Sequence, residues 1–348
     1  MDIITSSDAT VPPDSSEKER RVNWIDYAKG IGISLVVVGH ALRGLVDSLI
    51  LEPSALIQFV DTWIYAFHMP LFFFISGLFI SHSASKSFKN FLIDKLQTIA
   101  YPYFVWAILQ ELIRKLVGVD DQPIQSIWHI LYAPPMQFWF LYILLILSLS
   151  YTLFRKIGLS TKAFAIAACL LHAADLLNIN FGPWGVLNLL QLNAIYFAGG
   201  AVLAEFSLIN RIDKFSPFCM LASTVTGFFC MTVGVLFVNE FSISVPILAF
   251  MGTFSTLFLA KFLKQFKIAR FLEQWGLLSL QIFVAHTIFS AATRIVLQKV
   301  FHSSVSVTHI AVGILVGIYG PIGLYLICQK FKFPYAFTLR LQKAGSKN

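Results

Sequence analysis

The sequence contains ten apolar stretches that are candidates for helices crossing a lipid bilayer. Crossing the hydrocarbon core takes about 20 apolar residues in helical form. We predict helices over residues 25–46, 60–81, 99–117, 137–154, 163–179, 186–206, 216–238, 245–263, 276–298 and 307–329. The connections between them are short, so the pattern predicts an all-α polytopic membrane protein with about ten transmembrane helices.

The composition argues against a soluble or a disordered chain. Of the 348 residues, 57% are hydrophobic and only 13% are charged, whereas an average globular protein carries about 25% charged residues. The net charge of +8 could suggest a nucleic-acid partner. In a membrane protein, however, surplus basic residues more often mark the cytoplasmic loops, so we expect no nucleic-acid partner.

The basic residues are divided unevenly between the two sides of the predicted helices. If the N-terminus is cytoplasmic, 21 of the 26 Lys and Arg residues fall in cytoplasmic segments and five fall on the opposite side. Enrichment of Lys and Arg in cytoplasmic loops sets the orientation of membrane proteins. An odd number of helices would break this alternation, so the division predicts ten spans with both termini in the cytoplasm.

We expect one transmembrane domain over residues 23–331. Residues 1–22 are polar and rich in Pro and Ser, with no apolar core, and predict a disordered tail rather than a secretory signal peptide. Residues 332–348 predict a short basic cytoplasmic tail. The segment 82–97 mixes Lys and Asp with apolar residues and predicts an amphipathic helix along the membrane surface.

The first predicted helix carries ionisable side chains in an apolar background. Lys29 and His40 are 11 residues apart, which places them on one helix face and about 16 Å apart along the axis. Asp26 and Arg43 fall on the same stripe. Ionisable groups inside a membrane span are costly and usually functional. The alternatives are an i,i+3 ion pair of Asp26 with Lys29 at the interface, and a hydrogen bond from His40 to a neighbouring helix.

Two further histidines lie in predicted helices. His68 has a depth comparable to that of His40, and His286 ends the segment GLLSLQIFVAH. Histidines at similar depth on consecutive helices favour a shared cavity, in which a neutral imidazole can act as a general base; for His286, a simple packing role is the alternative. Ser76 and the glycine after it would allow close helix packing or contact with a ligand. Trp139 lies in an aromatic cluster that also fits a membrane-interface anchor.

Several enzyme classes lack their sequence motifs here. The chain contains no GxSxG nucleophile elbow, no HExxH zinc motif, no P-loop and no GxGxxG segment. This argues against a serine hydrolase, a zinc protease, an ATPase and a dinucleotide-dependent enzyme. We also expect no metal site.

Six segments follow one another in a characteristic order. They are IDYAKGIGISLVVVGHA (25–41), FHMPLFFFISGLFI (67–80), DKLQTIAYPYFVW (94–106), QFWFLYIL (137–144), AIYFAGGAVLAE (194–205) and GLLSLQIFVAH (276–286). Together they resemble acyltransferase family 3, a family of integral membrane acyltransferases, in its fucose 4-O-acetylase-like branch. The resemblance covers most of the chain, and the first two segments are the most specific.

The resemblance implies roles for individual residues. His40 matches the family's catalytic base, and Lys29 occupies a basic position, usually Arg, that contributes to acyl-CoA handling. We expect Lys95, in the basic turn before the third helix, to bind CoA phosphates together with Lys29. His68 is expected as a second catalytic residue that orients the substrate or stabilises an oxyanion. The expected substrate-binding residues are Asp26, Ser76, Trp139 and His286.

We therefore expect a membrane O-acyltransferase of the bacterial cytoplasmic (inner) membrane. It would move an acetyl group from cytoplasmic acetyl-CoA to a hydroxyl of an extracytoplasmic or lipid-linked sugar during exopolysaccharide or cell-surface glycan synthesis. The expected partners are acyl-CoA, a carbohydrate acceptor and the bilayer, and the resemblance is to the stand-alone form of the family. The alternatives are a transporter or flippase of a glycan or small metabolite, and a non-catalytic scaffold or sensor. Transport lacks the support of an inverted repeat or of paired broken helices.

Overall fold

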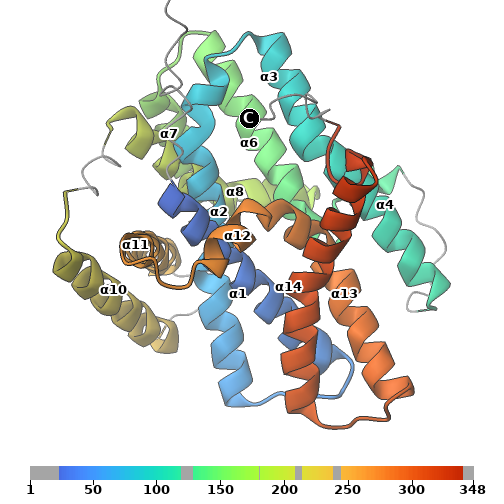
Figure 1. Cartoon of the computed structure of the whole chain (residues 1–348). Helices are drawn as coiled ribbons and strands as arrows, with labels where there is room; N and C mark the ends of the chain where they lie inside the picture. The colour runs from blue at the N-terminus through green and yellow to red at the C-terminus, as the bar shows by residue number, and fades with distance from the viewer. Residues whose placement is uncertain (1–22, 119–127, 180, 208–213, 238–243, 340–348) are drawn as a thin grey trace, which may run out of the picture.

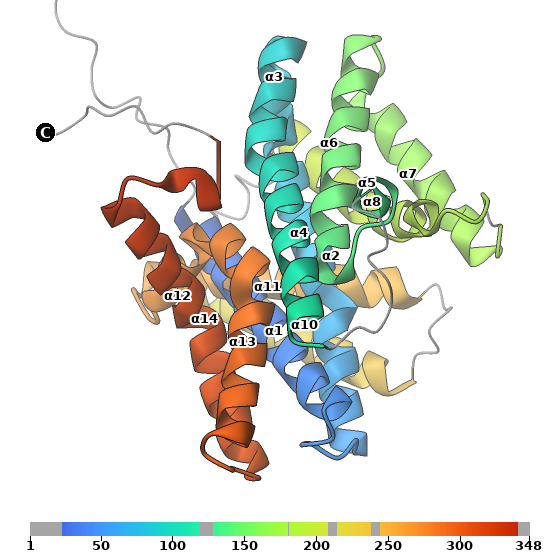
Figure 2. The same cartoon turned by 90° about the vertical axis from the view of Figure 1, so that its right-hand side faces the viewer.

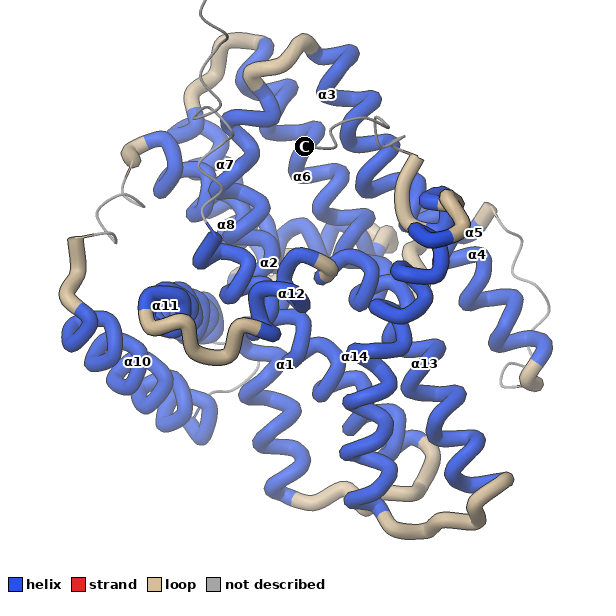
Figure 3. Tube along the Cα trace, viewed as in Figure 1, coloured by secondary structure: helices blue, strands red, loops and turns tan. Residues whose placement is uncertain are grey.

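The computed structural model describes residues 23–118, 128–179, 181–207, 214–237 and 244–339. The predicted tail 1–22 lies outside these ranges, as do residues 340–348 of the predicted C-terminal tail. Within these ranges the chain forms helices and connecting loops, with no strand (Figures 1 and 3).

Each of the ten predicted stretches corresponds to a helix. The longer helices are α1 (Asn23–Asp47), α2 (Ala55–Ala84), α3 (Phe88–Lys95), α4 (Tyr101–Leu116), α6 (Trp139–Lys156), α7 (Thr161–Leu176), α8 (Gly185–Glu205), α10 (Pro217–Phe237), α11 (Ser244–Gln265), α13 (Ser279–Lys299) and α14 (Ser306–Lys330). The short helices are α5 (His129–Tyr132) and α12 (Phe271–Leu277), with 3-10 turns at Met136–Phe138 and Pro334–Ala336.

In the described part of the chain, eight helices are long and apolar enough to cross a membrane. The prediction of an all-α polytopic membrane protein is therefore confirmed. The helices in the third and fifth predicted positions, α4 and α7, are not among the eight. Each has 16 residues of regular α-helix, or about 24 Å, against a hydrocarbon core of roughly 30 Å. Helix α4 is extended at its start by a π-helical turn and α3. The count of ten spans and the location of the termini stay predictions.

One segment differs from its prediction. Instead of a separate surface helix, α3 continues through a π-helical turn at Leu96–Ala100 into α4, and the combined helix runs beside α6 (Figure 2). Pro102 lies in the first turn of α4, after the π-helical turn. A mixed polar and apolar pattern shows which residues face a neighbour, but it does not show whether a helix stops.

Helices α1 and α2 lie at the centre of the molecule (Figure 1). Helix α2 packs against α8 and α11, while α1 packs against α11, α12, α13 and α14. The α1–α2 and α13–α14 connections lie at the same end of the molecule (Figures 1 and 2). This arrangement brings the adjoining ends of four helices together, and a cavity opens among them.

Two glycines make the contact between α2 and α8 possible. A Cβ atom on Gly77 would overlap the carbonyl oxygen of Phe197 in α8, and one on Gly200 would overlap the carbonyl oxygen of Phe74 in α2. The two backbones therefore touch directly, which only residues without a side chain permit. Of the two predicted uses of the glycine after Ser76, the structure shows close helix packing.

We expect Gly77→Ala to destabilise the protein, because the added methyl group meets backbone that cannot rotate away. Overpacking of this kind costs about 1–3 kcal/mol. The measurement is the melting temperature and the monodisperse yield of detergent-solubilised protein. Gly323→Ala is the matched control, since Gly323 lies within α14 with open space around it. Equal melting temperatures for the two variants would contradict the α2–α8 contact.

Candidate functional site

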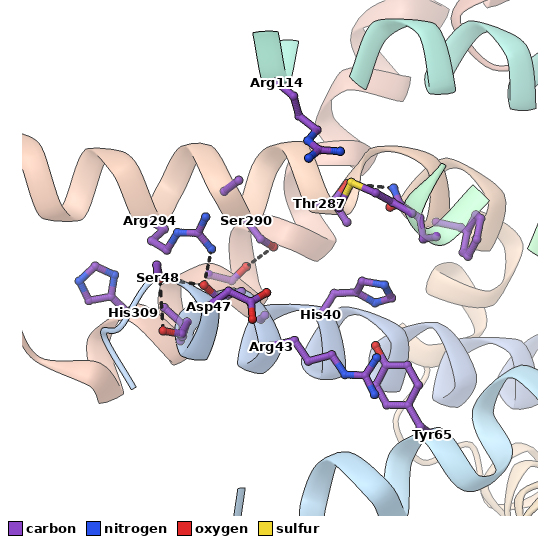
Figure 4. A pocket seen from close by; sticks show the side chains of 18 of the residues that line it. His40, Arg43, Asp47, Ser48, Tyr65, Arg114, Thr287, Ser290, Arg294 and His309 are labelled. Atoms are coloured by element: carbon purple, nitrogen blue, oxygen red, sulfur yellow. Dashed lines mark hydrogen bonds between the residues drawn. The ribbon is translucent and has the colours of Figure 1, made fainter. Parts of the chain in front are cut away.

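A cavity of about 710 Å³ opens between the ends of α1, α2, α13 and α14, with α4 and the start of α6 on one side. His40 extends from α1 into this cavity (Figure 4). His68 from α2 and Trp139 from α6 also line it. The structure thus brings together three of the predicted site residues from three different helices.

The imidazole rings of three predicted residues share one hydrogen-bonding pattern. The Nδ1 atom of His40 lies 2.9 Å from the carbonyl oxygen of Val36, and that of His68 lies 2.7 Å from the carbonyl oxygen of Ile64. In His286, Nδ1 lies 2.8 Å from the carbonyl oxygen of Phe283. A carbonyl oxygen only accepts, so each Nδ1 carries a hydrogen and each neutral ring keeps Nε2 as a hydrogen-bond acceptor.

His286 lies behind His40 rather than in the cavity wall. It is fully buried, and its ring makes an edge contact with the His40 ring at a centroid distance of 5.0 Å. Its Nε2 atom has no hydrogen-bond partner among the described residues, and the same holds for Nε2 of His68.

An ion pair closes the α1–α2 side of the cavity. The guanidinium of Arg43 donates from Nε and Nη2 to the two carboxylate oxygens of Asp61, at 2.7 Å each. The Cζ atom of Arg43 also lies 3.3 Å from the centroid of the Tyr65 ring. Tyr65 in turn makes an edge contact with the ring of His68. The paired charges fix the aromatic ring that supports His68.

A polar network ties the opposite side of the cavity together. Gln137, in the 3-10 turn that leads into α6, donates to Oε1 of Gln110 in α4 at 2.8 Å, and Thr287 in α13 donates to the same oxygen at 2.9 Å. Interhelical hydrogen bonds of this kind hold membrane helices together. They connect three helices at the level of the cavity, which Gln137 and Thr287 both line.

A second, smaller cavity of about 160 Å³ contains two other predicted residues, Lys29 and Ser76. Its remaining lining is mainly apolar and includes Thr98 in the π-helical turn between α3 and α4. Phe283 of α13 lines both cavities. Lys29 and His40 were predicted to share one helix face. In the structure they line different cavities, and the ring of Phe283 lies in the wall of both.

The remaining predicted residues line neither cavity. Asp26 is buried and lies 3.4 Å from the ammonium of Lys29, as the ion-pair alternative expected. The ammonium of Lys95 lies 5.5 Å from the centroid of the Phe91 ring. Burial, with a smaller contribution from Lys86, lowers the pKa of Lys95. The structure does not bring Lys95 to the cavity of Lys29, so its role with CoA stays a prediction.

Several cavity residues were not singled out from the sequence. They are Tyr65, Gln137, Thr287, Ser290, Arg294 and His309. Each lies in an interfacial or moderately polar stretch, where side chains of this kind are common. His40 was singled out because it is an ionisable residue in an apolar helix. The same criterion would also have selected Arg294 and His309.

Comparison with known proteins identifies the family. A family model described as an acyltransferase domain matches residues 22–326. The chain belongs to acyltransferase family 3. The match includes every predicted site residue, so the two cavities lie within the family domain. Whether the chain belongs to the fucose 4-O-acetylase-like branch stays a prediction.

One curated relative is the nodulation protein NolL of Mesorhizobium japonicum (strain LMG 29417 / CECT 9101 / MAFF 303099). The family member described here is 29% identical to it over 199 residues, which is 51% of this chain and 49% of NolL. The chain thus aligns with about half the length of this relative. No solved structure matches the chain.

The site of this family 3 protein combines a basic side chain, His40, with a cavity that it lines. His40 offers an unprotonated Nε2 in a cavity that has both polar and aromatic walls. In the described ranges, no group of three or more His, Cys, Asp or Glu side chains is arranged to hold a metal ion. Proton transfer by imidazole is the chemistry that the visible side chains supply directly.

We expect Arg43→Gln and Asp61→Asn each to lower the melting temperature. The melting temperature of the double variant should fall no further than that of the less stable single variant. The stability losses from substituting the two members of one ion pair do not add. An exposed pair contributes up to about 1 kcal/mol to the free energy of unfolding. Melting curves of the purified variants provide the measurement. Arg155→Gln is the control, because Arg155 is exposed and has no ion pair within the described chain. Fully additive losses would contradict the pairing.

Proposed function

We propose that the protein is a membrane O-acyltransferase that moves an acetyl group from cytoplasmic acetyl-CoA to a hydroxyl of an extracytoplasmic or lipid-linked sugar. Membership of the family supports the reaction class. The proposed location is a bacterial cytoplasmic (inner) membrane, and the proposed role is in exopolysaccharide or cell-surface glycan synthesis. The partners in this proposal are acyl-CoA, the carbohydrate acceptor and the bilayer.

The observation that carries the proposal is the state of His40. Its Nδ1 hydrogen is held by the carbonyl oxygen of Val36, so the ring presents Nε2 as the basic atom while it lines the larger cavity. A general base must have its lone pair free and within reach of the proton it removes. His40 meets the first condition through its own helix, without help from a substrate.

The proposed reaction uses this geometry in one step. Nε2 of His40 takes the proton of a sugar hydroxyl while the hydroxyl oxygen attacks the carbonyl carbon of the thioester. The carbon–sulfur bond then breaks, the new ester remains on the sugar, and the imidazolium returns its proton to the departing thiolate. The protein ends unchanged, and one thiol and one ester are formed from one alcohol and one thioester.

The smaller cavity fits the donor side of this reaction. It is narrow and mainly apolar, which suits the extended arm of a thioester better than a bulky charged nucleotide. Lys29 lines it and supplies a positive charge for phosphate groups. Asp26 restrains the Lys29 ammonium through their ion pair. Because Phe283 separates this cavity from His40, an arm threading from one cavity to the other passes that ring.

The other predicted residues take more limited roles. His68 presents an unprotonated Nε2, so it can accept a hydrogen bond from a sugar hydroxyl, but in its neutral form it cannot donate one to an oxyanion. Ser76 donates its hydroxyl hydrogen to the carbonyl oxygen of Phe72 and lines only the smaller cavity, which supports a role beside the donor. Trp139 offers an aromatic wall to the sugar, and His286 supports the His40 ring as a positioning residue.

We expect His40→Ala to abolish acetyl transfer while leaving the protein folded. Loss of a general base lowers kcat by about 100-fold to 10,000-fold. The measurement is thiol release from acetyl-CoA by purified protein in the presence of a lipid-extracted glycan fraction, together with the ester-linked acetate on surface glycans of expressing cells. Wild-type kcat in His40→Ala would exclude His40 as the base.

The control for this variant is His82→Ala. His82 lies in α2 like His68, but it is exposed and lies outside both cavities, so thiol release should stay at the wild-type level. The same assay separates transport from catalysis. Glycan accumulation in vesicles without thiol release by the unmodified protein would favour the flippase alternative and contradict the proposal.

We expect Lys29→Gln to raise the KM for acetyl-CoA with little change in kcat. A lost charge-assisted contact to phosphate costs about 1.5–3 kcal/mol, or roughly 10-fold to 100-fold in affinity. Acetyl-pantetheine has no nucleotide phosphates, so its KM should be the same in wild type and variant. Lys29→Arg should retain most of the affinity for acetyl-CoA. Equal KM increases for both donors would show that Lys29 does not contact phosphate.

A further inference from the structure

A polar cluster occupies the end of the larger cavity that lies away from His40, and no step of the reaction uses it. Asp47 and Ser48 come from the end of α1, Arg294 from α13 and His309 from α14. Figure 4 shows the four side chains gathered at one end of the cavity, with His40 and Tyr65 toward the other. We call these four residues the distal cluster.

The guanidinium of Arg294 is fixed by one hydrogen bond and keeps further N–H donors that no described residue uses. Its Nη1 atom donates to the carbonyl oxygen of Gly44 at 2.7 Å, and the side chain is half-buried. Among the described residues, no carboxylate lies within ion-pair distance of it. A guanidinium has five N–H donors in a fixed plane, so most of them are available to a molecule in the cavity. The exposed carboxylate of Asp47 lines the same end and offers acceptors.

His309 adds a buried acceptor. Only 2% of its surface is exposed, and its Nε2 atom lies 3.0 Å from the carbonyl oxygen of Ser303. That carbonyl can only accept, so Nε2 carries the hydrogen and Nδ1 has the lone pair. Nδ1 has no hydrogen-bond partner in the described ranges. A buried acceptor without a partner costs about 1–3 kcal/mol, and a ligand that brings an O–H donor removes this cost.

The mixture of donors and acceptors identifies the chemistry of the ligand. A carboxylate or a phosphodiester would suit Arg294, but at neutral pH it has no hydrogen to give to Nδ1 of His309 and it would be repelled by Asp47. A neutral sugar ring has neighbouring hydroxyls that both donate and accept. The distal cluster therefore fits a neutral carbohydrate better than an anion.

The position of the cluster adds a length requirement. Asp47 follows His40 by seven residues in α1, which is about 10 Å along the helix axis and longer than one pyranose ring. We propose that the distal cluster binds a neutral sugar residue neighbouring the one that is acylated, so that the acceptor is an oligosaccharide and not a monosaccharide. This inference rests on the proposed function, since it assumes that the acylated hydroxyl lies at His40.

The test is direct binding of the detergent-solubilised full chain to a glycan array. The array carries neutral and acidic bacterial surface oligosaccharides and the monosaccharides that compose them. We expect the wild-type protein to bind neutral oligosaccharides more tightly than their monosaccharides. Arg294→Gln and Asp47→Asn should each weaken oligosaccharide binding by about 10-fold to 100-fold, the effect of losing one charge-assisted hydrogen bond, and leave monosaccharide binding unchanged.

Controls separate the outcomes. Lys299→Gln removes an exposed basic residue of α13 that does not line the cavity, and it should bind like wild type. Asp47→Asn keeps the proposal testable if Arg294→Gln fails to fold, since melting curves report folding independently. Thiol release from acetyl-CoA is measured on the same preparations, so loss of acyl transfer and loss of the distal site are read separately. Equal binding of monosaccharides, binding of acidic glycans only, no binding of any glycan, or unchanged binding by both cluster variants would overturn the proposal.

Discussion

The site depends on a hydrogen bond that each of three imidazoles makes to its own helix. In a helix, the carbonyl oxygen of residue i−4 is already engaged by the backbone, but its second lone pair is still available. His40, His68 and His286 each donate from Nδ1 to such an oxygen. In an apolar interior this bond is strong because no water competes. It fixes the tautomer of three rings from three separate helices before any substrate arrives.

Helix packing then converts these fixed rings into a site. The direct backbone contact of α2 with α8, through Gly77 and Gly200, brings the middle of α2 against its neighbour and fixes the height of His68 beside α1. On the other side, the network of Gln110, Gln137 and Thr287 holds α13 at the level of the cavity. The polar groups of this network satisfy one another, as buried polar groups in an apolar environment must.

The sequence was sufficient to predict the fold class, because helix length and hydropathy follow from the thickness of the bilayer. All ten predicted stretches are helical, and His40, His68 and Trp139 line one cavity. The amphipathic pattern of α3 did not reveal its continuation into α4, since a π-helical turn keeps the chain helical without a sequence signal of its own.

The parts of the site that sequence reasoning missed depend on contacts between distant segments. Arg294 becomes a fixed donor only because α13 meets the carbonyl oxygen of Gly44, 250 residues earlier in the chain. His309 becomes a buried acceptor only because the preceding loop folds back to offer the carbonyl oxygen of Ser303. Lys29 and His40 share a face of α1, but Phe283 of α13 divides the space above that face. Periodicity along one helix contains none of this information.

The aromatic division between the two cavities has an electrical consequence. Phe283 packs against Phe140 at a ring-centroid distance of 5.4 Å, and Phe140 packs against Phe72 at 5.9 Å. A continuous aqueous path through the protein would short-circuit the membrane potential, which stores about 2.3 kcal/mol for each charge at 100 mV. All three rings line the smaller cavity, and their apolar contacts disfavour a column of water between it and the larger cavity. If the two cavities face opposite sides of the bilayer, as the proposed reaction requires, these contacts let both cavities take up substrate while the energised membrane stays sealed to protons and ions.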